Sequence, residues 1–414
     1  MSWNGHVVVD MDSHVYEEAD QSYQGYVDPA FQEPYGRLCE AIAQQRAAGL
    51  PYSLFMSRNA ILETSDEGRP LGMQDTFGLV PERRQSGAEE RVPARDRVRR
   101  EVNWEPRPRL EDMDRAGVDI GVIFPTHASS YCVLRDVMFE SALYRAYHRF
   151  IANFCAGGGG RLRWVALPNL RDVSTAVAEV TDWAERDPNL VGIYLTPVCP
   201  NGRLLDNPDL HPLFQRAQDL DLPMLVHPGV MRSPLTPGAL ELDNAGFLIR
   251  SVYNPWAGQT ALSALIGGGV FDLFPKLRIA TMETSGGWLP FVLAQLDERY
   301  EASAHLAPNL KRLPHEIIEE GRYFHALEVS EKYVEHCVHE LGEDLWIFST
   351  DYPHTGSPWP NGVSHIIDRK ALSNSTVRKI LGANAMRLCS RLASWSPVAG
   401  LGSRFKSRPH RRPE

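Results

Sequence analysis

The feature that most constrains the fold is an alternation of short apolar runs with longer segments of helical periodicity. The apolar runs lie at 7–12, 117–125, 161–168, 190–197, 222–228, 277–283, 322–328 and 345–351. Helical patterns separate them, for example at 137–154, 173–186, 211–220, 288–303 and 331–341. Strands that alternate with helices pair in parallel, because a parallel neighbour requires a crossover connection. Eight such units predict an α/β fold, a (β/α)8 TIM-type barrel. A doubly wound sheet would need a glycine-rich first turn, and the turn after the first run, D-S-H-V-Y-E, has no glycine.

The domain organisation follows from where this rhythm is interrupted. Residues 16–107 are rich in Pro, Gly, Gln and Arg and have weak periodicity. We interpret them as an insertion after strand one with some helix of its own, which would form a lid over the barrel mouth or an oligomer contact. The basic, Pro-broken segment 396–414 is predicted to be a disordered tail. Residues 1–395 are therefore expected to form a single barrel domain.

Composition excludes several classes of function. The net charge of -9 argues against a nucleic-acid surface. No apolar stretch is long enough to span a membrane, and the N-terminus has no secretion signal. The six cysteines never occur as C-x-x-C and fit a reducing compartment. We expect a cytoplasmic protein that acts on a small molecule and forms a homo-oligomer, most simply a dimer.

Polar residues close the first apolar run. The stretch V-V-V-D-M-D-S-H begins as a buried strand and ends in Asp10, Asp12 and His14. Because side chains alternate along a strand, these three residues are predicted to share one face. A lone Asp after a strand is commonly a helix cap, and a lone His a turn residue. The run by itself therefore leaves their role open.

Three other strand ends carry similar groups. His227 ends the fifth run, Glu283 ends the sixth, and Asp351 ends the eighth with His354 just beyond. The carboxyl ends of barrel strands form one face, so these residues should converge with those of strand one. Several buried carboxylates together require a cation. Imidazole and carboxylate without thiolate favour Zn, Mn or Fe.

These motifs together resemble the amidohydrolase superfamily. The motifs are D-x-D-x-H on strand one, L-V-H-P on strand five, M-E-T-S-G-G-W-L-P on strand six and S-T-D-Y-P-H on strand eight. The resemblance is to the amidohydrolase-related branch that includes aminocarboxymuconate-semialdehyde decarboxylase, and it covers most of residues 5–393. It implies a distorted barrel with one divalent metal, usually Zn or Mn.

The resemblance also implies residue roles. Asp12, His14, His227 and Asp351 match the metal ligands of the family, and Asp351 also matches its proton-transfer group. Asp12 stands where H-x-H relatives carry a histidine, and Glu283 stands where the decarboxylases carry one. We expect Asp351, Glu283 and His227 to act in catalysis, in a metal-dependent hydrolase or non-oxidative decarboxylase for a small carboxylated or carbonyl compound.

An excess of metal-seeking groups keeps other functions open. Glu283, His148 and His354 could together serve a second metal, although His148 in A-Y-H-R-F is equally typical of a buried helix histidine. Some relatives hold two metals, Fe/Fe or Mn/Fe, and act as oxygenases. The alternative function is therefore a dinuclear oxygenase on the same fold. A non-catalytic partner subunit is disfavoured because the ligand residues are retained.

Overall fold

Eight parallel strands form a single sheet in the order of the sequence. The computed structural model describes residues 3–47, 100–134, 136–229, 246–354 and 356–395. Its strands run in the order β1 to β8, and each pairs in parallel with the next. Their bounds are β1 Val9–Val15, β2 Ile120–Pro125, β3 Leu162–Ala166, β4 Leu190–Leu195, β5 Met224–Val226, β6 Ile279–Thr281, β7 Tyr323–Glu328 and β8 Trp346–Ser349. All eight predicted strands are present.

The first and last strands meet, which closes the sheet. Ser13 forms a parallel bridge with Tyr352, just beyond β8. The backbone N–H of Asp351 donates to the Asp12 carbonyl at 2.9 Å, and that of His14 donates to the Tyr352 carbonyl at 2.6 Å. The closure removes the sheet edges that an open sheet would leave. The predicted TIM-type barrel is confirmed.

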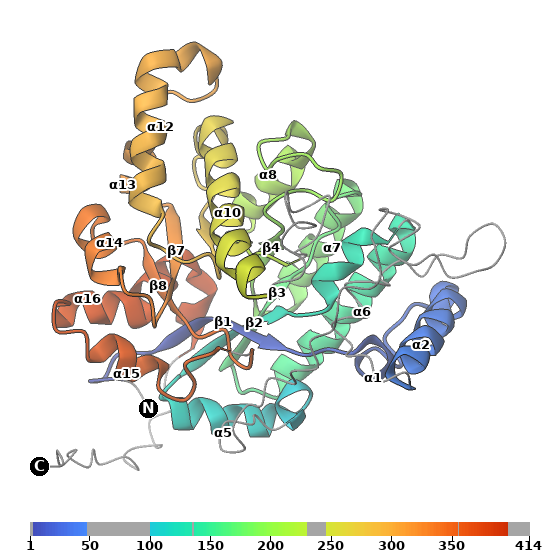
Figure 1. The fold of residues 1–414 in the computed structure, drawn as a ribbon. Coiled ribbons are helices and arrows are strands. Elements are labelled where there is room, and N and C mark those ends of the chain that lie inside the picture. The colour runs from blue at the N-terminus through green and yellow to red at the C-terminus, as the bar shows by residue number, and fades with distance from the viewer. Residues whose placement is uncertain (1–2, 48–99, 135, 230–245, 355, 396–414) are drawn as a thin grey trace, which may run out of the picture.

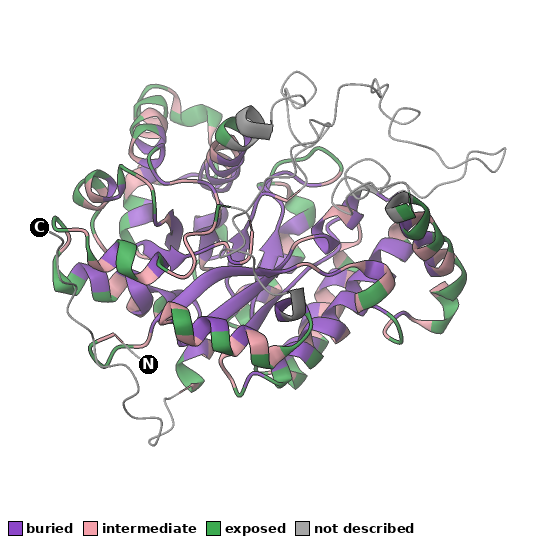
Figure 2. Cartoon of the chain, turned by 60° about the horizontal axis from the view of Figure 1, so that its bottom comes forward, coloured by how far each residue is buried: buried purple, intermediate pink, exposed green. Residues whose placement is uncertain are grey.

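Helices surround the barrel and expose their outer faces (Figures 1 and 2). The predicted helical segments are found with shifts of three residues or fewer at their ends. The main helices are α5 Pro106–Ala116, α6 Val137–Ala156, α7 Val173–Arg186, α8 His211–Asp219, α10 Gly246–Gly267, α12 Leu289–Ser303, α13 Pro314–Glu319 and α14 Val334–Leu341. Shorter helices α15 Gly362–Ile367, α16 Asn374–Arg378 and α17 Asn384–Leu388 follow β8. None of the helices in the described residues is long and apolar enough to cross a membrane.

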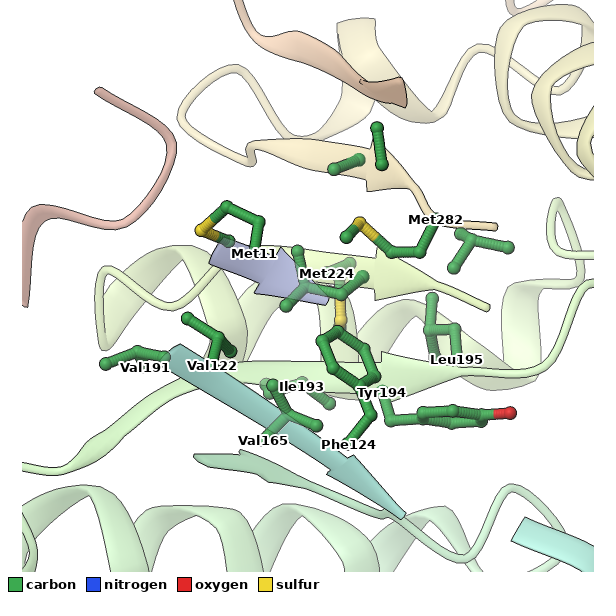
Figure 3. Packing of buried hydrophobic residues seen from close by; sticks show 14 of the residues in the cluster. Met11, Val122, Phe124, Val165, Val191, Ile193, Tyr194, Leu195, Met224 and Met282 are labelled. Carbon is green, nitrogen blue, oxygen red and sulfur yellow. The ribbon is translucent and has the colours of Figure 1, made fainter. Parts of the chain in front are cut away.

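The strands are buried on both faces, which explains why they appear in the sequence as continuous apolar runs. Every residue of β2, β3, β4, β5, β6 and β8 is buried. Met11, Phe124 and Met224, from three different strands, belong to one cluster of buried apolar side chains (Figure 3). A parallel barrel with helices outside shows this pattern because no strand face meets water.

Local sequence signals set the ends of two helices. The Asp136 carboxylate accepts from the backbone N–H groups of Met138 and Phe139 and so caps the start of α6. Helix α5 ends at Gly117, whose φ of 75° is the left-handed conformation that favours glycine. The second signal also turns the chain directly into β2.

The first described part of the predicted insertion, residues 16–47, packs beside α6. It contains α1 Ala19–Ser22 and α2 Gln32–Ala47. Asp28, between them, accepts from Arg145 and Arg149 of α6 at 2.7 Å each, and Phe31 stacks on Phe139 at 6.3 Å. Residues 48–99 and the predicted tail 396–414 lie outside the described residues.

Candidate metal centre and active site

A β-bulge in β1 separates Asp10 from Asp12 and His14. Asp10 pairs with Gly121 and Ser13 with Ile123, so β1 carries one more residue than β2 over this interval. The extra residue interrupts the alternation of side chains. Asp10 and Ser13 both line the cavity between β1 and α5. The prediction that Asp10 shares a face with Asp12 and His14 is therefore wrong.

The other predicted strand-end residues converge at the barrel mouth. Asp12 Oδ1 lies 3.1 Å from His14 Nε2, and Asp12 Oδ2 lies 3.5 Å from His227 Nε2. Asp351 Oδ1 lies 3.4 Å from His14 Nε2, and Glu283 Oε2 lies 3.4 Å from His227 Nε2. Side chains from β1 and from the loops after β5, β6 and β8 thus share one site, which is the carboxyl-end face of the barrel.

The two imidazoles present the same nitrogen to the site. His14 Nδ1 lies 3.2 Å from the Pro125 carbonyl, and His227 Nδ1 lies 2.7 Å from the Pro228 carbonyl. A carbonyl only accepts, so each Nδ1 carries a proton and each Nε2 is the nitrogen that faces the site. This arrangement orients a histidine for metal binding.

A set of polar atoms at the site has no hydrogen-bond partner, although each atom is buried. Among the described residues, these atoms include His14 Nε2, His227 Nε2 and both carboxylate oxygens of Asp12. Leaving such atoms unsatisfied is costly, and their contacts with one another are not aligned as hydrogen bonds. The ligand atoms of Asp12, His14 and His227 lie within 4.8 Å of one another. These residues fit a divalent metal with nitrogen and oxygen ligands.

The pKa values of the site residues also indicate that a bound cation would be favourable. Burial would raise the pKa of Asp12, but His227 and His14 together outweigh burial and hold this pKa well below its usual range. Burial would lower the pKa of His227, but Asp12, with Glu283 and Asp351, outweighs burial and raises this pKa to about 9. Burial, and then repulsion from Asp351, raises the pKa of Glu283 to about 8. Several carboxylates are thus buried close together, and a bound divalent cation would offset their charge.

Two of the site residues have unusual backbone conformations. Glu283 has a φ of 47° and Asp351 a φ of 54°. Such values are uncommon for residues other than glycine and concentrate at functional sites. Asn254 of α10 donates to Glu283 Oε1 at 3.0 Å. Sequence reasoning missed Asn254, because nothing in its helical context signals a contact with a strand end.

The two additional histidines have different positions. His354 Nδ1 lies 2.6 Å from Asp351 Oδ1, so His354 belongs to the site. His148 does not: its Nδ1 lies 3.0 Å from Glu179 Oε1, and its Nε2 accepts from the backbone N–H of Leu167 at 2.9 Å. Both ring nitrogens are occupied between α6, α7 and β3. His148 is therefore corrected from a possible second-metal ligand to a histidine that ties α6 to its neighbours.

A TIM-type barrel with this cluster at its strand ends defines a metal-dependent enzyme. The amidohydrolase family model matches residues 9–389. The chain belongs to the amidohydrolase family.

Several individual proteins are similar to it. It is 25% identical over 288 residues to a 2-amino-3-carboxymuconate-6-semialdehyde decarboxylase of Dictyostelium discoideum, covering 68% of this chain and 76% of that protein. A 5-carboxyvanillate decarboxylase of Novosphingobium aromaticivorans, solved with manganese, superposes with a TM-score of 0.65 at 19% identity over 93% of this chain and 97% of that one. A dihydroxybenzoic acid decarboxylase of a Polaromonas species, also solved with manganese, gives a TM-score of 0.61 at 18% identity over 92% of this chain and 96% of that one.

Proposed function

We propose that this protein is a metal-dependent, non-oxidative decarboxylase of small aromatic acids. The cluster of Asp12, His14 and His227, whose ligand atoms lie within 4.8 Å of one another, carries the proposal together with Asp351, which lies 3.4 Å from His14 Nε2. The relatives support the reaction, because those described above are decarboxylases of carboxylated compounds. They also support manganese as the metal and an aromatic acid with a hydroxyl near its carboxylate as the substrate.

The four candidate ligands differ in their access to substrate. The side chain of Asp12 is 1% exposed and that of Asp351 is 26% exposed. Asp12, His14 and His227 are the buried residues that would hold the metal. Asp351 would also reach the open side, where a carboxyl group can transfer a proton.

The reaction breaks the bond between the ring and the carboxylate and protonates the ring carbon. A divalent metal held by these residues would supply Lewis-acid chemistry to the substrate carboxylate. Asp351 delivers the proton to the carbon as CO₂ leaves. Glu283, 24% exposed and held by Asn254, lies on the same open side and orients the substrate against Asp351.

Two other functions use the same barrel. A hydrolase would employ the same ligands, with Asp351 taking a proton from water. A dinuclear oxygenase would need a second group of ligands. His14, Asp351 and His354 lie close enough to form one, whereas His148 is held between α6, α7 and β3 and cannot join it. Membership of the amidohydrolase family argues against a non-catalytic subunit.

The test combines metal analysis with a substrate panel. We expect one Mn or Zn per chain and CO₂ release from hydroxylated benzoates. Asp351→Asn should lower kcat by about 100-fold or more, and Glu283→Gln by about 100-fold, since each removes a group that acts at the reacting centre. Two irons with oxygen consumption, or hydrolysis without CO₂ release, would reject the proposal.

We also propose that residues 1–395 form a single domain and that the protein is a cytoplasmic homodimer, as the sequence predicts. The family match over 9–389 supports a single domain within 1–395. The six free cysteines support a cytoplasmic location. Exposed apolar side chains such as Phe291 and Leu306 support a homodimer. Light scattering of the purified protein measures the assembly.

A further inference from the structure

His354 lies between Asp351 and the loop that follows β2. Its Nδ1 is 2.6 Å from Asp351 Oδ1, and its Nε2 is 3.0 Å from Thr126 Oγ1. The ring stacks on that of His14 with centroids 4.0 Å apart. Both nitrogens are therefore in contact with protein groups. The ligand atoms of His14, Asp351 and His354 lie within 4.8 Å of one another, as they would in a metal site. An imidazole that accepts a hydrogen bond at one nitrogen and donates at the other has no lone pair left for a metal.

Thr126 is itself held by a buried carboxylate. Glu17, two residues beyond β1, accepts from the backbone N–H of Thr126 at 3.1 Å. It also accepts from His127 and Ala128 at 2.9 and 2.6 Å. Ala128 opens a short 3-10 helix, Ala128–Val133, whose first N–H groups have no partner within the helix. One side chain thus fixes the loop that carries the Thr126 hydroxyl.

The donor and the acceptor can be assigned for each successive contact from His14 through Thr126 to His354. His14 Nδ1 carries a proton because it lies on the Pro125 carbonyl. The Thr126 oxygen, 3.4 Å from the same Nδ1, is on the accepting side of that contact. Its own proton is then free for His354 Nε2. A ring that accepts at Nε2 carries its proton at Nδ1, the atom that faces Asp351.

We propose that His354 is a positioning residue for Asp351, and that the Thr126 hydroxyl holds the His354 ring in the orientation and tautomer that present a proton to this carboxylate. The assignment rests on the proposed function, in which Asp351 is both a metal ligand and the proton donor. It gives His354 a role within a one-metal site. Groups that orient a ligand in this way typically contribute about 10–100-fold in metal affinity or activity.

Two variants of Thr126 distinguish the effect of its hydroxyl group from the effect of its side-chain volume. Thr126→Val has the same volume and lacks the hydroxyl, whereas Thr126→Ser keeps it. We expect Thr126→Val to lower kcat by about 10-fold or more with KM near the wild-type value, and Thr126→Ser to recover most of this loss. The matched control is Thr181→Val on α7, where the hydroxyl bonds Val177 and Arg216 away from the site. This control should leave kcat unchanged.

Variants of His354 test the contact with Asp351 directly. Asparagine can place an amide nitrogen near the Nδ1 position, so His354→Asn should retain more activity than His354→Phe. Circular dichroism and thermal melts establish that each variant is folded. Equal kcat values for the two variants, both folded, would overturn the role of Nδ1.

A second measurement does not depend on finding the substrate. The enzyme loaded with Co²⁺ reports ligand geometry through its visible absorption, and a competing chelator gives its metal affinity. Thr126→Val should shift the spectrum and weaken Co²⁺ binding, and Thr126→Ser should do neither. If no aromatic acid is decarboxylated, the proposed function fails while this arm still tests the positioning. Identical spectra, affinities and kcat values for Thr126→Val and Thr126→Ser would overturn the inference.

Discussion

Asp10 and Thr350 join the first strand of the barrel to the end of the last. The backbone N–H and the hydroxyl of Thr350 both donate to the Asp10 carboxylate, at 3.0 and 2.5 Å. The carboxylate also accepts from the N–H of Asp12 at 3.3 Å. Since Asp12 and Asp351 flank this junction, the contact that closes the barrel also sets the spacing of two candidate ligands.

Removing this junction should weaken the fold. Asp10→Asn loses acceptor capacity and leaves a buried donor opposite the Thr350 hydroxyl, so we expect a destabilisation of about 1–3 kcal/mol. Thr350→Val removes only the hydroxyl and should cost about 1 kcal/mol. Urea unfolding at fixed metal concentration measures both. Midpoints equal to that of the wild type would show that the junction does not stabilise the barrel.

Metal removal should lower the melting temperature. The site buries imidazole and carboxylate atoms that have no partner among the described residues, so a bound cation stabilises the native state. Dialysis against a chelator should lower Tm, and Mn²⁺ at about 100 times its Kd should restore about 2.7 kcal/mol. Calorimetry records the shift. The Asp12→Asn protein, which lacks a central carboxylate, should show little response to Mn²⁺, and a full response would exclude Asp12 as a ligand.

His148 lies outside the site, so replacing it should change the stability of the fold and leave metal binding unchanged. His148 contacts Glu179 and the N–H of Leu167 in a buried position, so His148→Phe should destabilise the fold by about 1–3 kcal/mol. Its metal content should equal that of the wild type. Elemental analysis and thermal melts on one preparation measure both quantities. The loss of one metal equivalent would restore His148 as a ligand.

Glu17 should make stability depend on pH. Burial raises its pKa from 4.5 to about 7, against the hydrogen bonds that it accepts from Ala128 and its neighbours. Between these two pH values the native state holds a proton that the unfolded state has released, so the contribution of Glu17 to stability falls as pH rises. The expected loss is about 3 kcal/mol across this window.

The variant Glu17→Gln cannot titrate and should lack this slope. Urea unfolding of both proteins at pH 4.5 and pH 7.5 provides the comparison. Parallel pH profiles for the two proteins would show that Glu17 ionises in the native state as it does in the unfolded chain.

Much of the site could be predicted because barrel topology converts sequence position into spatial position. His227, Glu283 and Asp351 are far apart in the chain, yet each follows a parallel strand. Parallel strands in a barrel end on one face, so the strand predictions alone bring these residues together. The same reasoning missed Asn254 and Thr126, because a helix residue and a loop residue have no comparable rule to place them.

Two local features of the backbone could not be predicted from the sequence. Strict alternation placed Asp10 beside Asp12, and a single extra residue in β1 sends it instead to Thr350. A bulge leaves no reliable trace in a run of apolar and acidic residues. The left-handed φ of Asp351 is equally invisible, since only the surrounding fold holds such a conformation in place.

The sequence by itself determined the number and order of the strands, the parallel barrel and the residue types at its mouth, because periodicity and crossover connections are local properties of the chain. The tertiary structure alone decided which histidine serves the site. His148 and His354 are chemically identical, and only packing places one against Glu179 and the other against Asp351. A side chain's role depends on its partners, and partners distant in the chain are assigned only when the barrel closes.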